Sequence, residues 1–131
     1  MQLKSLLEKM IEVHASDVFI IAGLPLAYQA GGSHVRTDTP PLTPADTQEY
    51  IQTVYELAGR DLSLFTDSVN HDDDFSFAVP SVGRFRANIF RQRGSYGAVI
   101  RVIPFGLPDP DEMNIPESVM RLADLNRGLV L

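Results

Sequence analysis

Apolar residues at helical spacing mark two segments in the first half of the chain. The first segment carries them on one side of residues 3–11, at Leu3, Leu6, Leu7, Met10 and Ile11. The second begins after Thr43-Pro44, residue types favoured at the N-cap and at the first helical position, and it reaches Gly59, a residue type that commonly ends helices. Both segments are predicted to be amphipathic helices with one buried side.

Strands are expected between these two helices, where the helical spacing is lost. Ala15-Ser16-Asp17 breaks the helical pattern, and Val18–Ile21 then has the apolar run of a short buried strand. The pattern predicts a pair of strands over residues 26–36, with its turn at Gly31-Gly32.

The second half of the chain predicts three further strands. Apolar residues recur at every second position in residues 74–79, and residues 84–90 and 97–103 follow as strands on either side of Arg93-Gly94. Strands joined by such short turns pair antiparallel. The whole pattern therefore predicts the α/β class in its α+β form, a mostly antiparallel sheet with helices packed on it.

The apolar residues of the last two strands predict how these strands pair. A two-residue turn at Arg93-Gly94 places apolar residues opposite one another on one face, in the pairs Phe85–Val102, Ala87–Ile100 and Ile89–Ala98. A slip by one residue would turn every side chain of one strand to the other face, whereas a shift by two residues keeps the faces and stays open. On the other face Arg86 stands opposite Arg101, and Arg84 lies beside them.

This stretch concentrates positive charge in an acidic chain. Five arginines and no acidic residue lie between Arg84 and Arg101, although the net charge of the chain is −6. Opposed arginines repel unless an anion or carboxylates lie between them. One interpretation is a site for a phosphate group or an acidic partner surface, and the other is a solvated strand face neutralised by Asp72, Asp73 and Asp74. The absence of lysine favours recognition, because guanidinium groups bind planar anions through a fixed set of donors.

The composition excludes several classes of protein. The 131 residues fit one ordinary domain, and the apolar content of 44% is that of a soluble globular protein. No apolar run approaches the length of a transmembrane helix. The absence of cysteine excludes disulfides and thiolate zinc sites, and the acidic balance argues against a general nucleic-acid binder.

Other candidate chemistry in the chain is sparse. The run His71-Asp72-Asp73-Asp74 offers ligands for a divalent cation, but it lacks the glycine of a calcium loop, so a solvated turn is the favoured interpretation. Asp17 is expected to accept hydrogen bonds at the end of a helix or the start of a strand. No motif for phosphate binding, dinucleotide binding, serine hydrolysis or zinc proteolysis occurs. Neither a catalytic residue nor a metal site is therefore assigned.

The C-terminal residues follow a stretch rich in proline and acid, over residues 104–112. A short helix capped by Asn114 is expected next, and it ends at residues 126–128. Leu129-Val130-Leu131 then has the pattern of a strand that has just begun, with a C-terminal edge strand as the alternative.

Six segments, in order, resemble the N-terminal domain of the hexameric secretion and pilus ATPases, most closely the PilT-type retraction motors of type IV pili. They are Ala15–Val18, Ile21–Pro25, Asp74–Pro80, Gly83–Asn88, Val99–Pro104 and Arg127–Leu131. The spacing is consistent along essentially the whole chain. Phe19 stands where the family often has histidine, so any role of that histidine is absent here.

The resemblance implies a PAS-like domain in residues 1–104, a linker in residues 105–114, and the start of a RecA-like ATPase core in residues 115–131. The chain would then stop just before the Walker A loop. In that family two arginines of the N-terminal domain reach toward the nucleotide on the core, and by motif position they correspond to Arg86 and Arg101, with Arg84 as a third candidate. Their expected role is to neutralise phosphate charge rather than to make bonds.

The resemblance also implies ATP and Mg²⁺ as cofactors of the full-length ATPase. The isolated fragment is expected to bind neither and to be inactive alone. The expected partners are its own C-terminal RecA-like domain, neighbouring subunits of a homohexamer and a platform protein of the inner membrane, with no nucleic acid. The expected location is the cytoplasm, at the inner membrane below the pilus.

Two alternatives to a retraction motor stay open. One is the N-terminal domain of a type II secretion or pilus assembly ATPase, and the other is a free-standing PAS-like sensor or interaction module.

Overall fold

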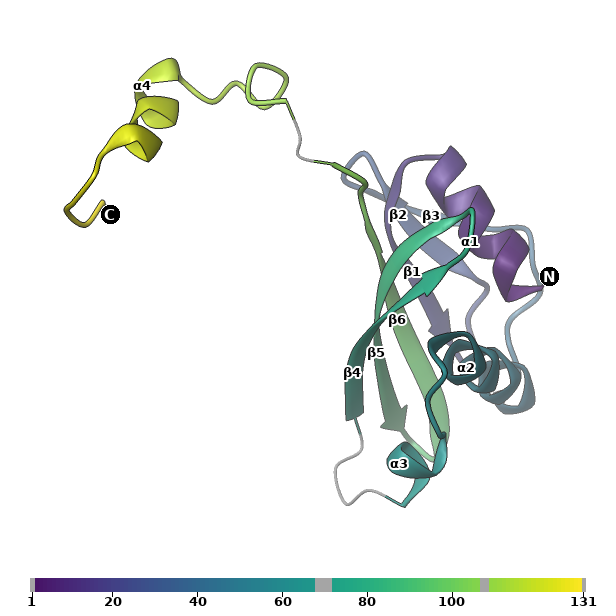
Figure 1. The fold of residues 1–131 in the computed structure, drawn as a ribbon. Helices are drawn as coiled ribbons and strands as arrows, with labels where there is room; N and C mark the ends of the chain where they lie inside the picture. The colour runs from purple at the N-terminus through teal and green to yellow at the C-terminus, as the bar shows by residue number, and fades with distance from the viewer. Residues whose placement is uncertain (1, 68–71, 107–108, 131) are drawn as a thin grey trace.

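The computed structural model describes residues 2–67, 72–106 and 109–130. Its strands are β1 (Ala15–Ile21), β2 (Ala27–Ala30), β3 (Ser33–Arg36), β4 (Asp72–Val79), β5 (Gly83–Gln92) and β6 (Ser95–Ile103). They form one antiparallel sheet in the order β3-β2-β1-β6-β5-β4. The two long helices lie against one face of this sheet (Figure 1). The predicted class, an antiparallel sheet with helices packed on it, is confirmed.

The two long helices lie where the sequence predicts them, as α1 (Leu3–Glu12) and α2 (Pro44–Ala58). Helix α2 begins with a capping box, in which the hydroxyl of Thr43 accepts from the amide of Asp46 and the Asp46 carboxylate accepts from the amide of Thr43. It ends at Gly59, whose φ of 62° is left-handed.

A one-turn helix, α3 (Ser63–Thr66), follows and lies outside the predicted elements. No helix in the described ranges is long and apolar enough to cross a membrane.

The core lies between the sheet and the two long helices. Its buried side chains from the helices are Leu3, Leu6, Leu7, Met10, Ile51, Val54 and Tyr55. Those from the central strands are Val18, Ile20, Phe85, Ala87, Ile89, Ala98 and Ile100. Successive side chains of a strand point to opposite faces, so the residues between these positions lie on the face of the sheet that the two long helices leave uncovered. That second face, called the open face below, carries Arg84, Arg86 and Arg101.

The predicted pairing of β5 with β6 is confirmed residue by residue. Phe85 pairs with Val102, and Arg86 pairs with Arg101, so a shift by two residues is excluded. The turn between these strands consists of Arg93 and Gly94, both with positive φ. This left-handed backbone matches the twist of paired strands.

Strand β1 begins earlier than predicted, at Ala15. Ala15 pairs with Ala30, and Asp17 pairs with Gln29, so Ser16 is an extra residue in a β-bulge. A bulge interrupts the two-residue alternation, which explains why Ala15-Ser16-Asp17 looks like a break in the sequence pattern.

Two predictions for the C-terminal residues are wrong. Helix α4 (Glu117–Met120) begins after Pro116, whereas Asn114 has a φ of 54° and donates its amide to Asp111 in a turn. A 3-10 turn, η1 (Arg121–Asp124), continues α4. Residues 129 and 130 form no strand, since a strand needs a pairing partner and the described part of the chain offers them none. Leu131 lies outside the described residues.

Asp73 joins helix α2 to strand β4 on the helix side of the sheet. Its carboxylate accepts from the Tyr55 hydroxyl at 2.7 Å and from Arg60 Nη2 at 3.0 and 3.3 Å. The guanidinium of Arg60 also lies 4.6 Å from the centre of the Phe75 ring. Burial, and next the hydrogen bond to Asp73, raise the pKa of Tyr55 above its ordinary value.

The domain is therefore expected to lose stability as the pH rises above about 10, the pKa of an unperturbed tyrosine. Above that pH the unfolded chain releases the Tyr55 proton and the folded chain keeps it, so base favours unfolding. Tyr55→Phe should cost about 1–2 kcal/mol at pH 7 and weaken this dependence on pH. Urea unfolding at pH 7 and at pH 10.5 measures both effects. An equal dependence of stability on pH in parent and variant would contradict the prediction. Burial also raises the pKa of Tyr50, and the comparison separates the two tyrosines because Tyr50 is present in both proteins.

Candidate functional site

Strands β5 and β6 place two of the predicted arginines side by side on the open face. Arg86 and Arg101 are direct partners in the ladder between these strands. Arg84, the third candidate, is exposed on the same face and pairs with Ile103. The apolar pairs occupy the opposite face, as the sequence predicts, and Arg86 and Arg101 therefore lie together on the open face.

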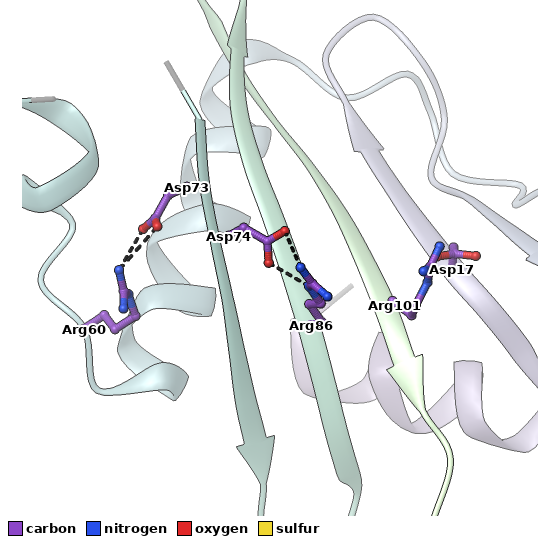
Figure 2. A network of polar contacts seen from close by, with 6 residues as sticks. All are labelled: Asp17, Arg60, Asp73, Asp74, Arg86 and Arg101. Carbon is purple, nitrogen blue, oxygen red and sulfur yellow. Dashed lines mark hydrogen bonds and ion pairs between the residues drawn. The ribbon is translucent and has the colours of Figure 1, made fainter. Parts of the chain in front are cut away.

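Each arginine of this pair is bound by a carboxylate from the strand on its outer side. Arg86 donates from Nε to Asp74 Oδ1 at 2.8 Å and from Nη2 to Asp74 Oδ2 at 3.1 Å. Arg101 donates from Nε to Asp17 Oδ1 at 2.9 Å. The four side chains form a row of acid, arginine, arginine and acid across β4, β5, β6 and β1 (Figure 2). These carboxylates offset the repulsion between the two arginines.

The neutralising partners match the expected ones only in part. Of the acidic residues 72–74, Asp74 alone binds an arginine of the pair, and Asp73 points to the helix side, where it binds Arg60 (Figure 2). The second partner is Asp17, for which the sequence predicted only a hydrogen-bonding role at the end of a helix or the start of a strand. Asp17 is the one acidic residue of β1, and β1 pairs with the strand that carries Arg101. This acidic residue in an otherwise uncharged strand is the signal that could have identified the partner of Arg101.

The two ion pairs differ in burial. The side chains of Arg86 and Asp74 are 61% and 44% exposed, whereas those of Arg101 and Asp17 are 67% and 12% exposed. Asp17 lies on β1, between β2 and β6, and Asp74 lies on the edge strand β4. The hydrogen bonds from Arg86 hold the pKa of Asp74 below its ordinary value, and Asp74 in turn raises the pKa of Arg86.

The two ion pairs line a shallow hollow of about 300 Å³ on the open face. Asn88 and Val99 complete its lining. Arg84 lies instead beside a separate hollow, of about 500 Å³, at the β4–β5 turn. The first hollow presents two guanidinium groups, each paired with a carboxylate, and a side-chain amide, so it can bind an anion through the donors that the carboxylates leave unoccupied.

The described part of the acidic run, residues 72–74, does not gather metal ligands at one point. Asp72, Asp73 and Asp74 pair with residues 88–90 of β5, so they belong to a strand and the predicted solvated turn is wrong. Asp73 and Asp74 point to opposite faces, and His71 lies outside the described residues. Among the residues described, no three potential metal ligands come together.

Comparison with known proteins identifies relatives of the whole chain. No family model matches it. The type IV pilus ATPase PilU of Pseudomonas aeruginosa is 35% identical over 132 residues, which cover 100% of this chain and 33% of PilU. The type IV pilus retraction ATPase PilT of the same organism is 36% identical over 118 residues, 89% of this chain and 33% of PilT. The chain thus spans about a third of the length of these relatives.

Solved structures give the same result. The crystal structure of the pilus retraction motor PilT with bound ADP matches 95% of this chain and 36% of the PilT chain, with a TM-score of 0.73 and 35% identity. The ATPase DotB of Legionella pneumophila, at 21% identity and a TM-score of 0.62, shares the fold. The chain belongs to the PilT-type ATPases and corresponds to their N-terminal region.

Proposed function

We propose that the chain is the N-terminal domain of a hexameric ATPase motor that powers type IV pilus retraction and twitching motility. In this proposal Arg86 and Arg101 close over ATP that the RecA-like core domain binds together with Mg²⁺. The observation that carries it is the adjacent pair of guanidinium groups on the open face of the sheet. The similarity to a retraction motor crystallised with ADP supports a nucleotide as the anion.

The proposed contribution is electrostatic. Phosphoryl transfer is accelerated mainly by positioning and by cations that stabilise charge on the transferring group. Two arginines that are direct partners on neighbouring strands supply such charge, and neither needs to gain or lose a proton. Arg84 would add to the positive field at longer range, since it lies outside the hollow that the other two line.

The proposal divides the chain at residue 104. Residues 1–104 form the PAS-like domain, residues 105–114 form a linker, and residues 115–131 begin the RecA-like core. The sheet ends at Ile103, and α4 lies away from it (Figure 1). Large apolar side chains of the last segment are exposed, which supports packing against protein outside this chain: Val119, Met120, Leu122, Leu125, Leu129 and Val130.

The proposed partners follow from the same similarity. They are the chain's own RecA-like domain, the neighbouring subunits of a homohexamer and a platform protein of the inner membrane, at which the cytoplasmic motor would sit. The identities with PilU and PilT favour a pilus ATPase over a type II secretion ATPase.

The test is to replace Arg86 and Arg101 singly with alanine in the full-length protein. Each variant is expected to lower ATP turnover by about 10-fold or more, because removing a charge-stabilising donor commonly costs at least this much. Arg36→Ala is the matched control, since Arg36 is an exposed arginine of edge strand β3, outside the hollow. Unchanged turnover in both hollow variants, with the hexamer intact, would refute the proposed role.

A further inference from the structure

The two arginines of the hollow use different numbers of nitrogen atoms to bind their carboxylates. Arg86 engages Asp74 side-on, through Nε and Nη2, and both oxygens of Asp74 accept. Arg101 engages Asp17 through Nε alone. Its two terminal nitrogens make no hydrogen bond to another described residue, and its side chain is 67% exposed. Arg101 therefore keeps both terminal nitrogens for the hollow, whereas Arg86 has one edge, made by Nε and Nη2, occupied by Asp74.

The two carboxylates also differ in how easily they can leave. Asp17 is 12% exposed and lies on a strand with neighbours on both sides, so its separation from Arg101 would leave a buried charge without a partner. Asp74 is 44% exposed on the edge strand, where water can solvate it once Arg86 moves away. Exposed ion pairs contribute little to stability, so an incoming anion can displace Asp74 at low cost.

We infer that the two arginines have different roles toward an incoming phosphate. Asp17 positions Arg101 as a fixed anion-binding group, and Asp74 masks Arg86 until the phosphate displaces it. Asp74 is then an internal competitor that lowers the anion affinity of the free domain. This inference rests on the proposed function, because it concerns the regulation of the same site.

Displacement by an anion, rather than protonation, is the way this mask opens. The hydrogen bonds from Arg86 keep the pKa of Asp74 below its ordinary value, so Asp74 stays charged throughout the neutral and mildly acidic range. A phosphate chain carries several charges and can contact both arginines, whereas the Asp74 carboxylate carries one charge and contacts only Arg86.

The test measures binding of inorganic tripolyphosphate to the 131-residue chain by NMR titration at low salt. Asp74→Asn is expected to raise the association constant by about two- to five-fold, the range that corresponds to loss of one exposed ion pair. Asp17→Asn should lower it, because Arg101 loses its positioning partner. Asp72→Asn is the matched control: it changes the net charge equally, on the same face of β4, at a residue that forms no ion pair with a described residue.

Three results would overturn the inference. The first is an equal rise of the association constant in Asp74→Asn and in Asp72→Asn. The second is that Asp74→Asn raises the association constant as much in a chain that carries Arg86→Ala as in the parent chain. Either result would mean that net charge alone accounts for the effect. The third is no measurable tripolyphosphate binding by Asp74→Asn. An amide spectrum confirms that each variant is folded. No ATP hydrolysis enters this test, so its failure leaves the turnover experiment on the arginines to decide the proposed function separately.

Discussion

Replacing Phe85 with alanine is expected to lower the free energy of unfolding by about 3–5 kcal/mol, the range for large-to-small changes at buried aromatic residues. Phe85 is fully buried, its ring stacks on Phe77 at 5.4 Å between centroids, and it lies on the helix side of β5. The change leaves a cavity between the sheet and the helices that the packed neighbours cannot fill. Urea unfolding should show an earlier midpoint with an unchanged slope.

Phe19→Ala is the matched control for this prediction. Phe19 is also on a central strand, but it is half-buried on the open face, where it pairs with Val99 and where water can occupy the space left by the ring. A loss of about 1 kcal/mol is expected. Equal losses in the two variants would mean that the two faces of the sheet are assigned wrongly.

The two faces of the hairpin formed by β5 and β6 could be predicted from sequence because the information is local. Phe85 and Val102 are apolar partners across a two-residue turn, so the turn and the alternation together determine the pairing. Once that pairing is known, the opposition of Arg86 and Arg101 follows without any tertiary information. The capped helix α2 is predictable for the same reason, since Thr43, Asp46 and Gly59 act within their own turns.

The partner of Arg101 could not be predicted in this way. Asp17 and Arg101 are 84 residues apart, and they meet only because β1 pairs with β6 in the centre of the sheet. The bulge at Ser16 further obscures the pattern, because it removes the alternation that would have assigned Asp17 to a face. Contacts between distant strands depend on the topology of the whole sheet, which local patterns do not contain.

The wrong predictions near the C-terminus have a related cause. Asn114 is a residue type favoured at helix N-caps, but it is equally suited to the left-handed turn conformation that it adopts. Leu129 and Val130 have the composition of a strand, but pairing requires a neighbouring strand. Local propensity predicts a strand only where the rest of the protein supplies its partner.

The double variant Arg86→Ala with Arg101→Ala is expected to lower kcat/KM for ATP in the full-length protein by about 10²–10³-fold. Arg101→Ala alone should account for most of this loss, because it removes the arginine that Asp17 holds in place. Arg86→Ala alone should cost less, about 10-fold, since part of the energy of any Arg86–phosphate contact is spent on displacing Asp74. Steady-state kinetics on purified hexamers measures all three variants.

The losses of the single variants are not expected to multiply. Without Arg101 the phosphate is no longer held in the hollow, and Arg86 returns to Asp74, so removing Arg86 as well changes little. The double variant should therefore lie close to Arg101→Ala. A double loss equal to the product of the single losses would mean that the two arginines act independently, and a larger loss in Arg86→Ala than in Arg101→Ala would contradict the assignment of Arg101 as the fixed group. Arg36→Ala, which removes the same charge from edge strand β3, should leave kcat/KM within about two-fold of the parent because Arg36 lies outside the hollow.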